Sequence, residues 1–400
     1  MMLFTGQSLK EKALLKLLSH LEFGSLELTL PNSDTHYFKG HQPGPECDLQ
    51  LNAPKALNRL LSDGKMGFCE GYMAGELDSS DLSALVQLAV LHDSYIEENM
   101  SFGRLQTLFR KLLHWRNRNN KQGSRRNISY HYDLGNNFYE KWLDNSMTYS
   151  SAIFADEEEK LDAGQRRKYE RLADLADIQP GDHVLEIGCG WGGFAEYAAA
   201  ERGAIIDGIT ISPSQHDFAK NRIEQAGLSD KAHIRMCDYR DLDKRYDKII
   251  SIEMFEAVGE AYWPIYFKTL SNCLKSGGKA ALQVITIDDA AFHEYKSQPD
   301  FIQKYIFPGG MLPSMEGLEN PLAHAGLKLD RHDGFGLDYA RTLALWREKF
   351  LSAWPELRQM NKFDQRFKRM WELYLCYCEG GFRAGMIDVK QMLIEHRSSQ

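Results

Sequence analysis

Val184-Leu-Glu-Ile-Gly-Cys-Gly-Trp-Gly-Gly193 is typical of a short β-strand that runs into a glycine-rich turn and then into a helix. Such a turn lets backbone N–H groups approach a ligand closely. The glycines at 188, 190 and 193 satisfy the GxGxxG pattern, which is also found in dinucleotide-binding enzymes. The stretch therefore predicts a cofactor loop and leaves the kind of cofactor open.

The acidic residues around this loop favour a cofactor other than a dinucleotide. Glu186 lies two residues before the first glycine, where a carboxylate suits an ammonium group better than a pyrophosphate. A dinucleotide site needs an acid at the end of the second strand, but that strand ends in Gly208-Ile-Thr-Ile-Ser212 and Asp207 comes too early. Asp238 follows the third strand, where a carboxylate can bind the amine of an adenine. These features indicate the S-adenosylmethionine site of a class I methyltransferase, and the alternative is a turn needed only for packing.

The chain around the loop alternates helices with short apolar strands. This alternation predicts a Rossmann-like α/β fold, in which helices cover a mostly parallel sheet. The expected helices span 166–175, 193–201 and 214–226, and the expected strands span 183–187, 204–209, 233–236, 248–252 and 279–285. We expect the tail, residues 342–397, to form two long helices around Trp354-Pro355. Residues 24–30 alternate in polarity with a period of two, which predicts a strand near the N-terminus.

Composition restricts the class of protein. The 400 residues are 43% hydrophobic and 26% charged, which indicates a globular chain of two or three domains. No uncharged apolar stretch approaches the ~18 residues that a membrane span needs. Lys10, Glu11, Lys12 and Lys16 interrupt the N-terminal leucines, so we expect an amphipathic helix rather than a signal peptide, and a cytoplasmic protein.

The cysteines and histidines do not indicate a metal site. The seven cysteines are scattered without CxxC spacing, and the thirteen histidines show no ligand-like spacing. We therefore expect no bound metal.

A basic segment stands out in a chain whose net charge is −8. Residues 101–132 contain eight lysines and arginines and no acid, and their leucines follow the spacing of one helical face. The overall negative charge argues against a nucleic-acid partner. The basic amphipathic helix is expected either to dock on anionic lipid headgroups or to pack on its own domain with a solvated basic face.

Several motifs in order resemble the cyclopropane fatty acid synthase and mycolic acid methyltransferase family. The resemblance covers roughly residue 128 to the C-terminus, and it implies an S-adenosylmethionine-dependent enzyme that acts on lipid. The matching motifs are Tyr130-His-Tyr-Asp-Leu-Gly-Asn136, Met147-Thr-Tyr-Ser150, Glu186-Ile-Gly-Cys-Gly-Trp-Gly-Gly193, Gly208-Ile-Thr-Ile-Ser-Pro-Ser-Gln215, Met254-Phe-Glu-Ala-Val-Gly259 and Tyr305-Ile-Phe-Pro-Gly-Gly310.

The resemblance also implies which residues form the site. Glu256 and Tyr339 match positions around a bicarbonate ion, which is the general base of the family. We expect Glu256 to stabilise and position the reacting groups, and the neighbouring Glu253 to face solvent. The residues expected to bind S-adenosylmethionine are Tyr149, Ser150, Glu186, Gly188, Gly190, Gly192, Thr210, Gln215 and Ile252, with Asp238 and Tyr239 near the adenine.

Two positions of the implied bicarbonate site depart from the cyclopropane-forming members. Ser151 stands where they have cysteine, and Gln283 stands where they have histidine. Serine and glutamine can hydrogen-bond an anion, but neither titrates near neutral pH. The resemblance implies transfer of a methyl(ene) group to the cis double bond of unsaturated phospholipid acyl chains, with a cyclopropane as product if the site binds its bicarbonate through neutral donors. Alternatively, deprotonation differs and the product is a methylated alkene that leads to methyl-branched or furan fatty acids.

The resemblance predicts two domains. Residues 1–126 would form a lipid-binding α+β domain that ends in the basic helix, and residues 127–400 would form the methyltransferase with helices that cover an acyl chain. Residues 292–313 are candidates for part of that cover. The expected partner is an unsaturated phospholipid in the inner face of the membrane, and the oligomeric state, including a homodimer, stays open. The alternatives are a methyltransferase of a small soluble molecule and a lipid-binding protein without catalysis.

Overall fold

The computed structural model describes residues 8–99, 123, 134–360 and 363–397. The chain forms two compact units. The first unit combines Met1–Lys111 with Phe350–Met386, and the second combines Leu112–Lys349 with Ile387–Gln400. Most of the basic segment predicted at 101–132 lies outside the described residues.

The first unit contains a four-stranded sheet in the order β2-β1-β3-β4. Strands β1 and β2 pair antiparallel, whereas β1 and β3 pair parallel. Leu26 and Leu28 of β1 are buried and Glu27 between them is exposed, as expected for a strand with one covered face. The elements are α1 (Leu9–Leu18), β1 (Phe23–Thr29), β2 (Thr35–Lys39), β3 (Gln42–Leu51), α2 (Pro54–Met73), β4 (Leu77–Asp78), α3 (Leu82–Leu91) and α4 (Asp93–Asn99).

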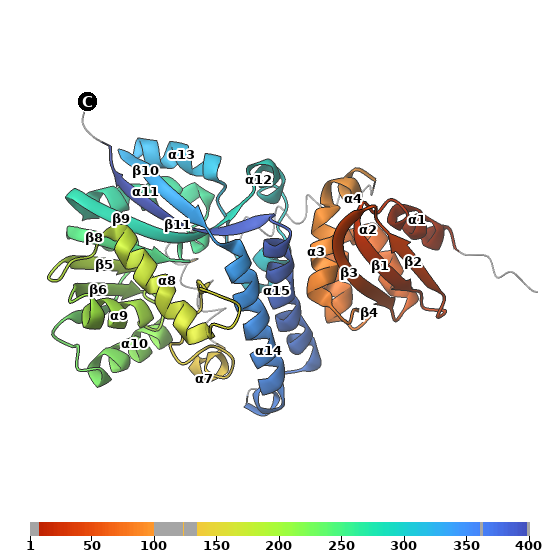
Figure 1. Ribbon diagram of the computed structural model, residues 1–400, viewed down its shortest axis with the longest axis horizontal. Helices are drawn as coiled ribbons and strands as arrows, with labels where there is room; N and C mark the ends of the chain where they lie inside the picture. Colours follow the sequence, from red (N-terminus) through yellow and green to blue (C-terminus); the bar gives the residue numbers. More distant parts are fainter. Residues whose placement is uncertain (1–7, 100–122, 124–133, 361–362, 398–400) are drawn as a thin grey trace, which may run out of the picture. The chain divides into compact units, whose positions relative to one another are not determined.

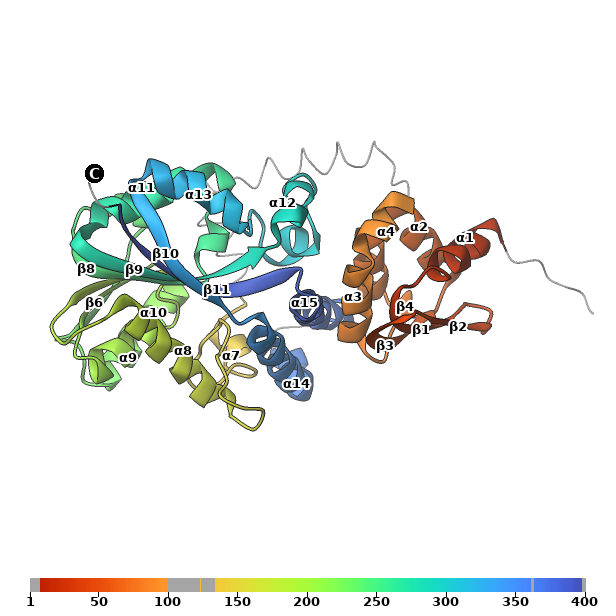
Figure 2. The same ribbon diagram turned by 45° about the horizontal axis from the view of Figure 1, so that its top comes forward.

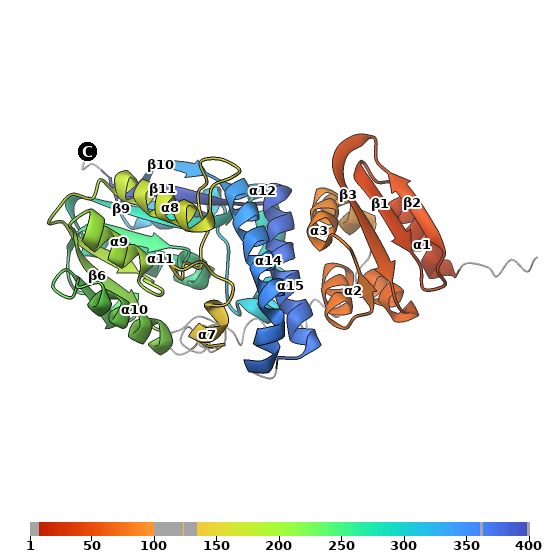
Figure 3. The same ribbon diagram turned by 60° about the horizontal axis from the view of Figure 1, so that its bottom comes forward.

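The helix α15 (Gln365–Arg383) packs on these N-terminal elements, beside the end of α14 (Gly336–Met360) (Figure 3). Arg369 donates hydrogen bonds to the backbone carbonyls of Tyr72 and Leu77 and to the carboxylate of Asp78. Gly380 lies so close to α3 that a Cβ atom there would be 2.9 Å from the Ser83 carbonyl oxygen. In the structure α15 is therefore folded with the N-terminal residues, whereas the sequence predicts residues 127–400 as one domain.

The second unit is built on a seven-stranded sheet in the order β10-β11-β9-β8-β5-β6-β7 (Figure 1). The pairs from β9 to β7 are parallel, and β11 runs antiparallel to both of its neighbours. This arrangement confirms the expected α/β fold. The strands are β5 (His183–Ile187), β6 (Ile205–Thr210), β7 (Ala232–Met236), β8 (Tyr246–Ile252), β9 (Leu274–Ile287), β10 (Leu327–Gly334) and β11 (Ile387–His396).

Helices cover both faces of this sheet (Figure 2). One apolar core lies between the sheet and α8, α9 and α10, and includes Leu172, Phe194 and Ile223. The other core lies on the α11 and α13 side, and includes Phe267 and Leu318. The helices are α7 (Asn136–Tyr139), α8 (Leu161–Ala176), α9 (Gly193–Glu201), α10 (Pro213–Gln225), α11 (Trp263–Cys273), α12 (Asp289–Tyr295) and α13 (Met315–His324).

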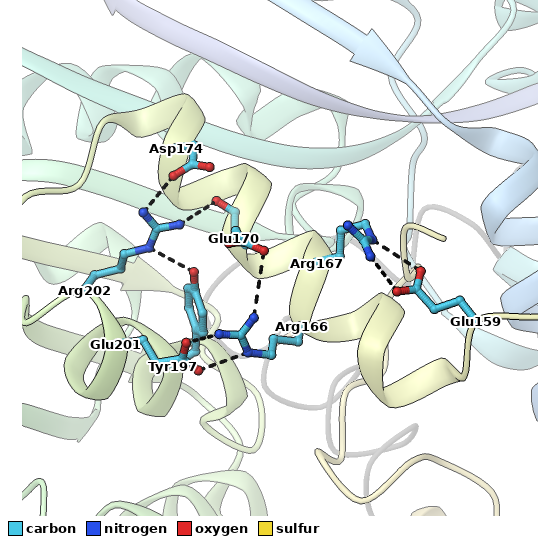
Figure 4. A network of polar contacts seen from close by, with 8 residues as sticks. All are labelled: Glu159, Arg166, Arg167, Glu170, Asp174, Tyr197, Glu201 and Arg202. Atoms are coloured by element: carbon cyan, nitrogen blue, oxygen red, sulfur yellow. Dashed lines mark hydrogen bonds and ion pairs between the residues drawn. The ribbon is translucent and has the colours of Figure 1, made fainter. Parts of the chain in front are cut away.

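Polar contacts hold α8 against α9 on the surface of this unit (Figure 4). Arg166 forms an ion pair with Glu201, and Arg202 pairs with Asp174 at 2.8 Å while it donates a hydrogen bond to the Tyr197 hydroxyl at 2.9 Å. These contacts position α8, whose opposite side carries residues of the candidate site.

The prediction for the tail is wrong in two respects. The helix α14 continues through Pro355 and ends at Met360, and residues 387–396 form β11 rather than a helix. A proline removes one helical hydrogen bond but does not always end a helix. The strand β11 lies between β9 and β10, so both of its edges are hydrogen-bonded, and these pairings are long-range contacts that local periodicity does not reveal.

Candidate active site

The glycine-rich loop joins β5 to α9, as the sequence predicts. Gly188, Gly190 and Gly192 have φ angles of 83°, 52° and 82°, a region that side chains other than glycine rarely adopt. A Cβ atom at Gly188 would lie 2.6 Å from the Met254 Cγ atom. The loop lies at the carboxyl edge of the parallel strands, next to the point where the strand order reverses between β5 and β8, which is where open α/β sheets bind ligands.

Glu186 presents an unpaired carboxylate oxygen beneath this loop. The residue is 3% exposed, and among the described residues its buried Oε2 atom has no hydrogen-bond partner. Desolvation raises the pKa of Glu186 to about 8, although the positive charge of Lys168 acts in the opposite direction. A buried oxygen without a partner costs free energy. An ammonium group of a ligand would satisfy this oxygen.

The second strand ends in a hydroxyl and an amide. The Thr210 hydroxyl donates a hydrogen bond to Gln215 Oε1 at 3.0 Å and accepts one from the Ser212 N–H at 3.2 Å. The Ser212 side chain caps α10 by accepting from the Gln215 N–H. Thr210 and Gln215 are thereby brought together at the edge of the sheet, as the sequence predicts.

Asp238 follows β7 and is 3% exposed. Its carboxylate accepts two hydrogen bonds from the Arg240 guanidinium, at 2.8 and 2.6 Å. A carboxylate has about four acceptor sites, so the predicted contact with an adenine amine would be shared with this arginine. Arg240 also lies over the ring of Tyr239, the other residue predicted near the adenine.

Tyr149 and Ser150 lie between an aromatic cluster and a buried lysine. The Tyr149 ring packs at 5.3–5.5 Å, between ring centroids, from Tyr139, Trp142 and Trp346. Lys168 of α8 is fully buried and donates a hydrogen bond from Nζ to the Ser150 hydroxyl at 2.6 Å. Desolvation lowers the pKa of Lys168 to about 8, and nearby carboxylates, that of Glu253 foremost, act against this shift.

Glu253 is the centre of the predicted catalytic cluster. Its Oε1 atom accepts hydrogen bonds from the Ser151 N–H at 2.9 Å and from Gln283 Nε2 at 2.7 Å. Its Oε2 atom accepts one from the Tyr339 hydroxyl at 2.6 Å. Desolvation raises the pKa of Glu253, while Lys168 and these hydrogen bonds act to lower it. The structure thus brings Ser151, Gln283 and Tyr339 together around a carboxylate of the protein.

Glu256, the acid predicted to act in catalysis, lies close to this cluster. Its Oε1 atom accepts a hydrogen bond from the Ile285 N–H at 2.6 Å, and its buried Oε2 atom has no partner among the described residues. Desolvation raises the pKa of Glu256 to about 8, and the charge of Glu253 adds to the shift. The two carboxylates therefore repel each other, and a positive charge between them would be stabilised.

The expectation that Glu253 faces solvent is wrong. The residue follows the last position of β8, Ile252, and its φ angle of 47° turns the chain sharply. The sequence could have predicted this position, because Glu253 directly follows a strand and residues at the carboxyl ends of parallel strands lie near ligands. Lys168 was missed as well. It lies on the buried face of α8 with Leu161, Leu172 and Ala176. A lysine among apolar residues at helical spacing could have indicated a functional role.

A glutamine pair connects these groups across the sheet. Gln391 of β11 is in register with Gln283 of β9 and donates from Nε2 to Gln283 Oε1 at 3.1 Å. The same Nε2 atom donates to the backbone carbonyl of Lys168 at 3.1 Å. These bonds orient the Gln283 amide so that its Nε2 atom donates to Glu253. Within the described ranges, no cluster of three or more His, Cys, Asp or Glu side chains could hold a metal ion.

Comparison with known families identifies the protein class. The model of the mycolic acid cyclopropane synthetase family matches residues 119–392. The chain belongs to this family. It is an S-adenosylmethionine-dependent methyltransferase, which confirms the family, the enzyme class and the methyl donor inferred from the sequence motifs. This membership sets aside the alternative of a protein without catalysis.

Several individual proteins are similar to this chain over most of its length. The tuberculostearic acid methyltransferase UfaA1 of Mycobacterium tuberculosis (strain ATCC 25618 / H37Rv) is 42% identical over 86% of this chain and 82% of its own length. The cyclopropane-fatty-acyl-phospholipid synthase of Escherichia coli (strain K12) is 34% identical over 87% of each chain. The cyclopropane synthase MmaA2 from Mycobacterium tuberculosis matches the fold with a TM-score of 0.63 and 28% identity, over 68% of this chain and 97% of its own.

S-adenosylmethionine fits the residues of this family member. The unpaired Glu186 oxygen suits its ammonium group, and Gly188 leaves room where a side chain would meet Met254. The individual contacts predicted for the donor and for the catalytic cluster stay predictions. None of the described helices has both the length and the apolar character that crossing a bilayer requires.

Proposed function

We propose that the enzyme transfers the methyl group of S-adenosylmethionine to a carbon of a cis double bond in a phospholipid acyl chain. We further propose that the product keeps an alkene and carries the new carbon as a branch, rather than as a cyclopropane ring. One observation carries this proposal. The donors that correspond to the family's bicarbonate site, Ser151, Gln283 and Tyr339, all bind the Glu253 carboxylate.

The two partly buried carboxylates suit a reaction on an isolated double bond. S-adenosylmethionine supplies an electrophilic methyl group, and attack by the double bond leaves a carbocation on the acyl chain. Glu253 and Glu256 have raised pKa values because they are desolvated. A cation between them would be stabilised by preorganised carboxyl groups.

The relatives support a lipid substrate. UfaA1 is named for tuberculostearic acid, and the Escherichia coli relative is named for fatty-acyl phospholipids. The greater identity, 42% against 34%, is to the methyltransferase named without a cyclopropane product. These names favour methyl transfer to an acyl chain, and they agree with the altered residues Ser151 and Gln283.

Ring closure is the second candidate. The cyclopropane-fatty-acyl-phospholipid synthase of Escherichia coli matches 87% of this chain, and the sequence motifs predict Tyr339 and Glu256 at the family's site. Ring formation requires removal of a proton from the transferred methyl group, whereas alkene formation requires removal of one from the acyl chain. The two candidates therefore differ only in which proton the base removes.

We also propose that the enzyme docks on anionic membrane surfaces through residues 101–132. This proposal rests on the eight basic residues in the sequence, all of which lie outside the described part. Each lysine or arginine near an anionic surface contributes about 1 kcal/mol before screening by salt. Replacing Arg116, Arg118, Arg125 and Arg126 by glutamine should weaken vesicle binding at low salt and leave S-adenosylmethionine binding unchanged. Unchanged vesicle sedimentation would contradict the role of this segment.

The product identifies the reaction. The enzyme is incubated with methyl-labelled S-adenosylmethionine and vesicles of cis-unsaturated anionic phospholipid, and the acyl products are analysed by mass spectrometry and NMR. A labelled methyl or methylene branch on an alkene is the expected result. A labelled ring methylene would establish the second candidate, and transfer only to a small soluble acceptor would contradict the lipid substrate.

A further inference from the structure

The mycolic acid cyclopropane synthetase family is expected to bind bicarbonate where the structure has Glu253. We propose that the Glu253 carboxylate replaces this ion and acts as the general base of the reaction. The inference rests on the proposed function in one respect, since it assumes that the reaction forms a cation that must lose a proton.

The hydrogen bonds around Glu253 are those that a small oxyanion would receive. A backbone N–H, a side-chain amide and a phenol hydroxyl donate to it, from Ser151, Gln283 and Tyr339, at 2.9, 2.7 and 2.6 Å. The donors come from the loop before α8, from β9 and from α14. Because the glutamate carboxylate occupies all three donors, a separate bicarbonate ion would have to displace it.

One acceptor position of this carboxylate remains for a proton. Each oxygen has two lone pairs. The Oε1 atom accepts two hydrogen bonds, whereas among the described residues Oε2 accepts only that of Tyr339. The Ser151 hydroxyl is directed elsewhere, since it donates to the Ala152 carbonyl at 2.9 Å. The second lone pair of Oε2 is therefore available to the substrate.

The backbone at Glu253 is strained, and the strained turn places its carboxylate among the three donors. Its φ angle of 47° is in the left-handed region, which costs roughly 1 kcal/mol or more for a residue other than glycine. The Glu253 N–H donates to the Gln283 carbonyl at 2.8 Å, which fixes the turn directly after β8. Strain of this kind persists at sites where surrounding contacts enforce it. Glycine would adopt this conformation without strain.

Methyl transfer from sulfur to carbon comes before the loss of the proton. The two π electrons of the double bond form a carbon–carbon bond to the methyl group, and the carbon–sulfur bond breaks with its electrons on sulfur, which leaves neutral S-adenosylhomocysteine. The adjacent carbon becomes a cation. Glu253 Oε2 takes one proton, and the electrons of that carbon–hydrogen bond close either the new alkene or the ring. Glu253 is then a neutral acid, and it returns the proton to water before the next turnover.

The surrounding charges favour such a base. Desolvation raises the pKa of Glu253 above that of an ordinary carboxylate, which strengthens it as a proton acceptor. The Lys168 ammonium group acts in the opposite direction, because a nearby positive charge favours the ionised carboxylate. Desolvation, and after it the charge of Glu253, raises the pKa of Glu256 to about 8, whereas hydrogen bonds from Tyr339, Gln283 and Ser151 act to lower the pKa of Glu253.

The test compares the wild type with Glu253→Gly, in which glycine suits the backbone and the side chain with its carboxylate is removed. Binding of 13C-bicarbonate is measured by NMR on the protein with S-adenosylhomocysteine, so no lipid substrate is needed. We expect no bicarbonate binding to the wild type, and binding to Glu253→Gly through the three vacated donors. Bicarbonate binding to the wild type, or none to the variant, would overturn the proposal.

The activity measurement uses labelled S-adenosylmethionine and unsaturated phospholipid vesicles in buffer depleted of carbon dioxide. The wild type should keep its full rate, whereas Glu253→Gly should lose at least 100-fold and regain activity when bicarbonate is added. A wild-type rate that falls on depletion, or a variant that is active without bicarbonate, would contradict the role of Glu253. A wild type that transfers no methyl group to phospholipid would instead contradict the proposed function, and the binding measurement would still decide the inference.

Asp177→Gly is the matched control. Asp177 is also an acid with a positive φ angle, 56°, and it caps the C-terminus of α8 outside the site. Its replacement removes one negative charge and relieves the same kind of strain. We expect this variant to keep wild-type activity in depleted buffer and to bind no bicarbonate, which would show that the effects at position 253 depend on its place between the three donors.

Discussion

Four ionisable side chains dominate the electrostatics of the site: Glu186 and Lys168, which are buried, and Glu253 and Glu256, which are partly buried. Desolvation raises the pKa of each carboxyl group and lowers that of the lysine. Among these four residues Lys168 is the one basic group, so the three carboxyl groups outnumber the basic groups. The excess suits a site for a cationic donor and a cationic intermediate.

Glu186 should contribute mainly to binding of S-adenosylmethionine. We expect Glu186→Gln to weaken binding of the donor about 10- to 100-fold, because a charge-assisted hydrogen bond to its ammonium group becomes a neutral one. Titration calorimetry with S-adenosylmethionine measures the change. Glu201→Gln, on the exposed end of α9, is the control and should bind as the wild type does. Equal affinities of all three proteins would show that the donor does not use Glu186.

Glu256 should make the stability of the free enzyme depend on pH. Its pKa of about 8 lies above the usual 4.5, so between these values the folded chain holds a proton that the unfolded chain has lost. Stability from this proton is complete below about pH 4.5 and is lost as pH rises through about 8. Between pH 5 and 8.5 the free energy of unfolding should fall in both proteins, and the fall should be about 1–3 kcal/mol smaller in Glu256→Gln than in the wild type.

Urea denaturation at several pH values measures this effect. The same variant should keep binding of S-adenosylmethionine and lose most of its turnover, since an amide cannot ionise next to the cation as the Glu256 carboxyl group can. A pH dependence identical to that of the wild type would mean that Glu256 is as well solvated when folded as when unfolded. Wild-type turnover would remove its carboxylate from the mechanism.

The backbone conformation and the packing of the turn between β5 and α9 limit which residues can occupy it. Gly188→Ala should destabilise the fold by about 2–4 kcal/mol, because the added Cβ would combine a positive φ angle with a 2.6 Å approach to Met254. Gly190→Ala is the matched control. It also has a positive φ angle, but nothing lies within 4 Å of its Cβ position, so the cost should be near 1 kcal/mol.

Thermal and urea denaturation of the two variants separates the steric effect from the backbone effect. Equal losses of stability would show that Met254 moves away without cost. A larger loss at Gly190 would mean that the loop is not shaped by its contact with the segment after β8.

The whole chain does not divide where its local composition changes. The helix α15 belongs to the first unit, where Arg369 binds the end of α2 and β4 and Gly380 lies against α3. A fragment of residues 127–400, the predicted catalytic domain, would leave these contacts unmade and the apolar side of α15 exposed. We expect this fragment to aggregate or to unfold at a lower temperature than the full chain.

A substitution in the full chain tests the same packing. Gly380→Ala would place a Cβ atom 2.9 Å from the Ser83 carbonyl oxygen and 2.7 Å from Val86, and should cost about 1–3 kcal/mol. Scanning calorimetry of fragment, variant and wild type provides the comparison. A fragment that melts cooperatively at the wild-type temperature would show that α15 is stable without the N-terminal elements.

Local sequence was sufficient for the catalytic fold. The strand at 183–187 and the helix at 193–201 coincide with β5 and α9, and the glycines between them have the expected positive φ angles. These features depend on neighbours within a few residues, through glycine conformation and apolar periodicity. The family motifs are local in the same sense, and they led to the correct enzyme class and methyl donor.

The arrangement of charges was decided by the tertiary structure alone. Ser151, Glu253, Gln283 and Tyr339 are far apart in sequence, and they meet because β8 and β9 are neighbours in the sheet and α14 crosses the same edge. Lys168 is buried beside them because its helix turns that side toward the sheet. Which of two nearby glutamates holds the central position depends on one backbone angle after a strand, and side-chain periodicity carries no information about that angle.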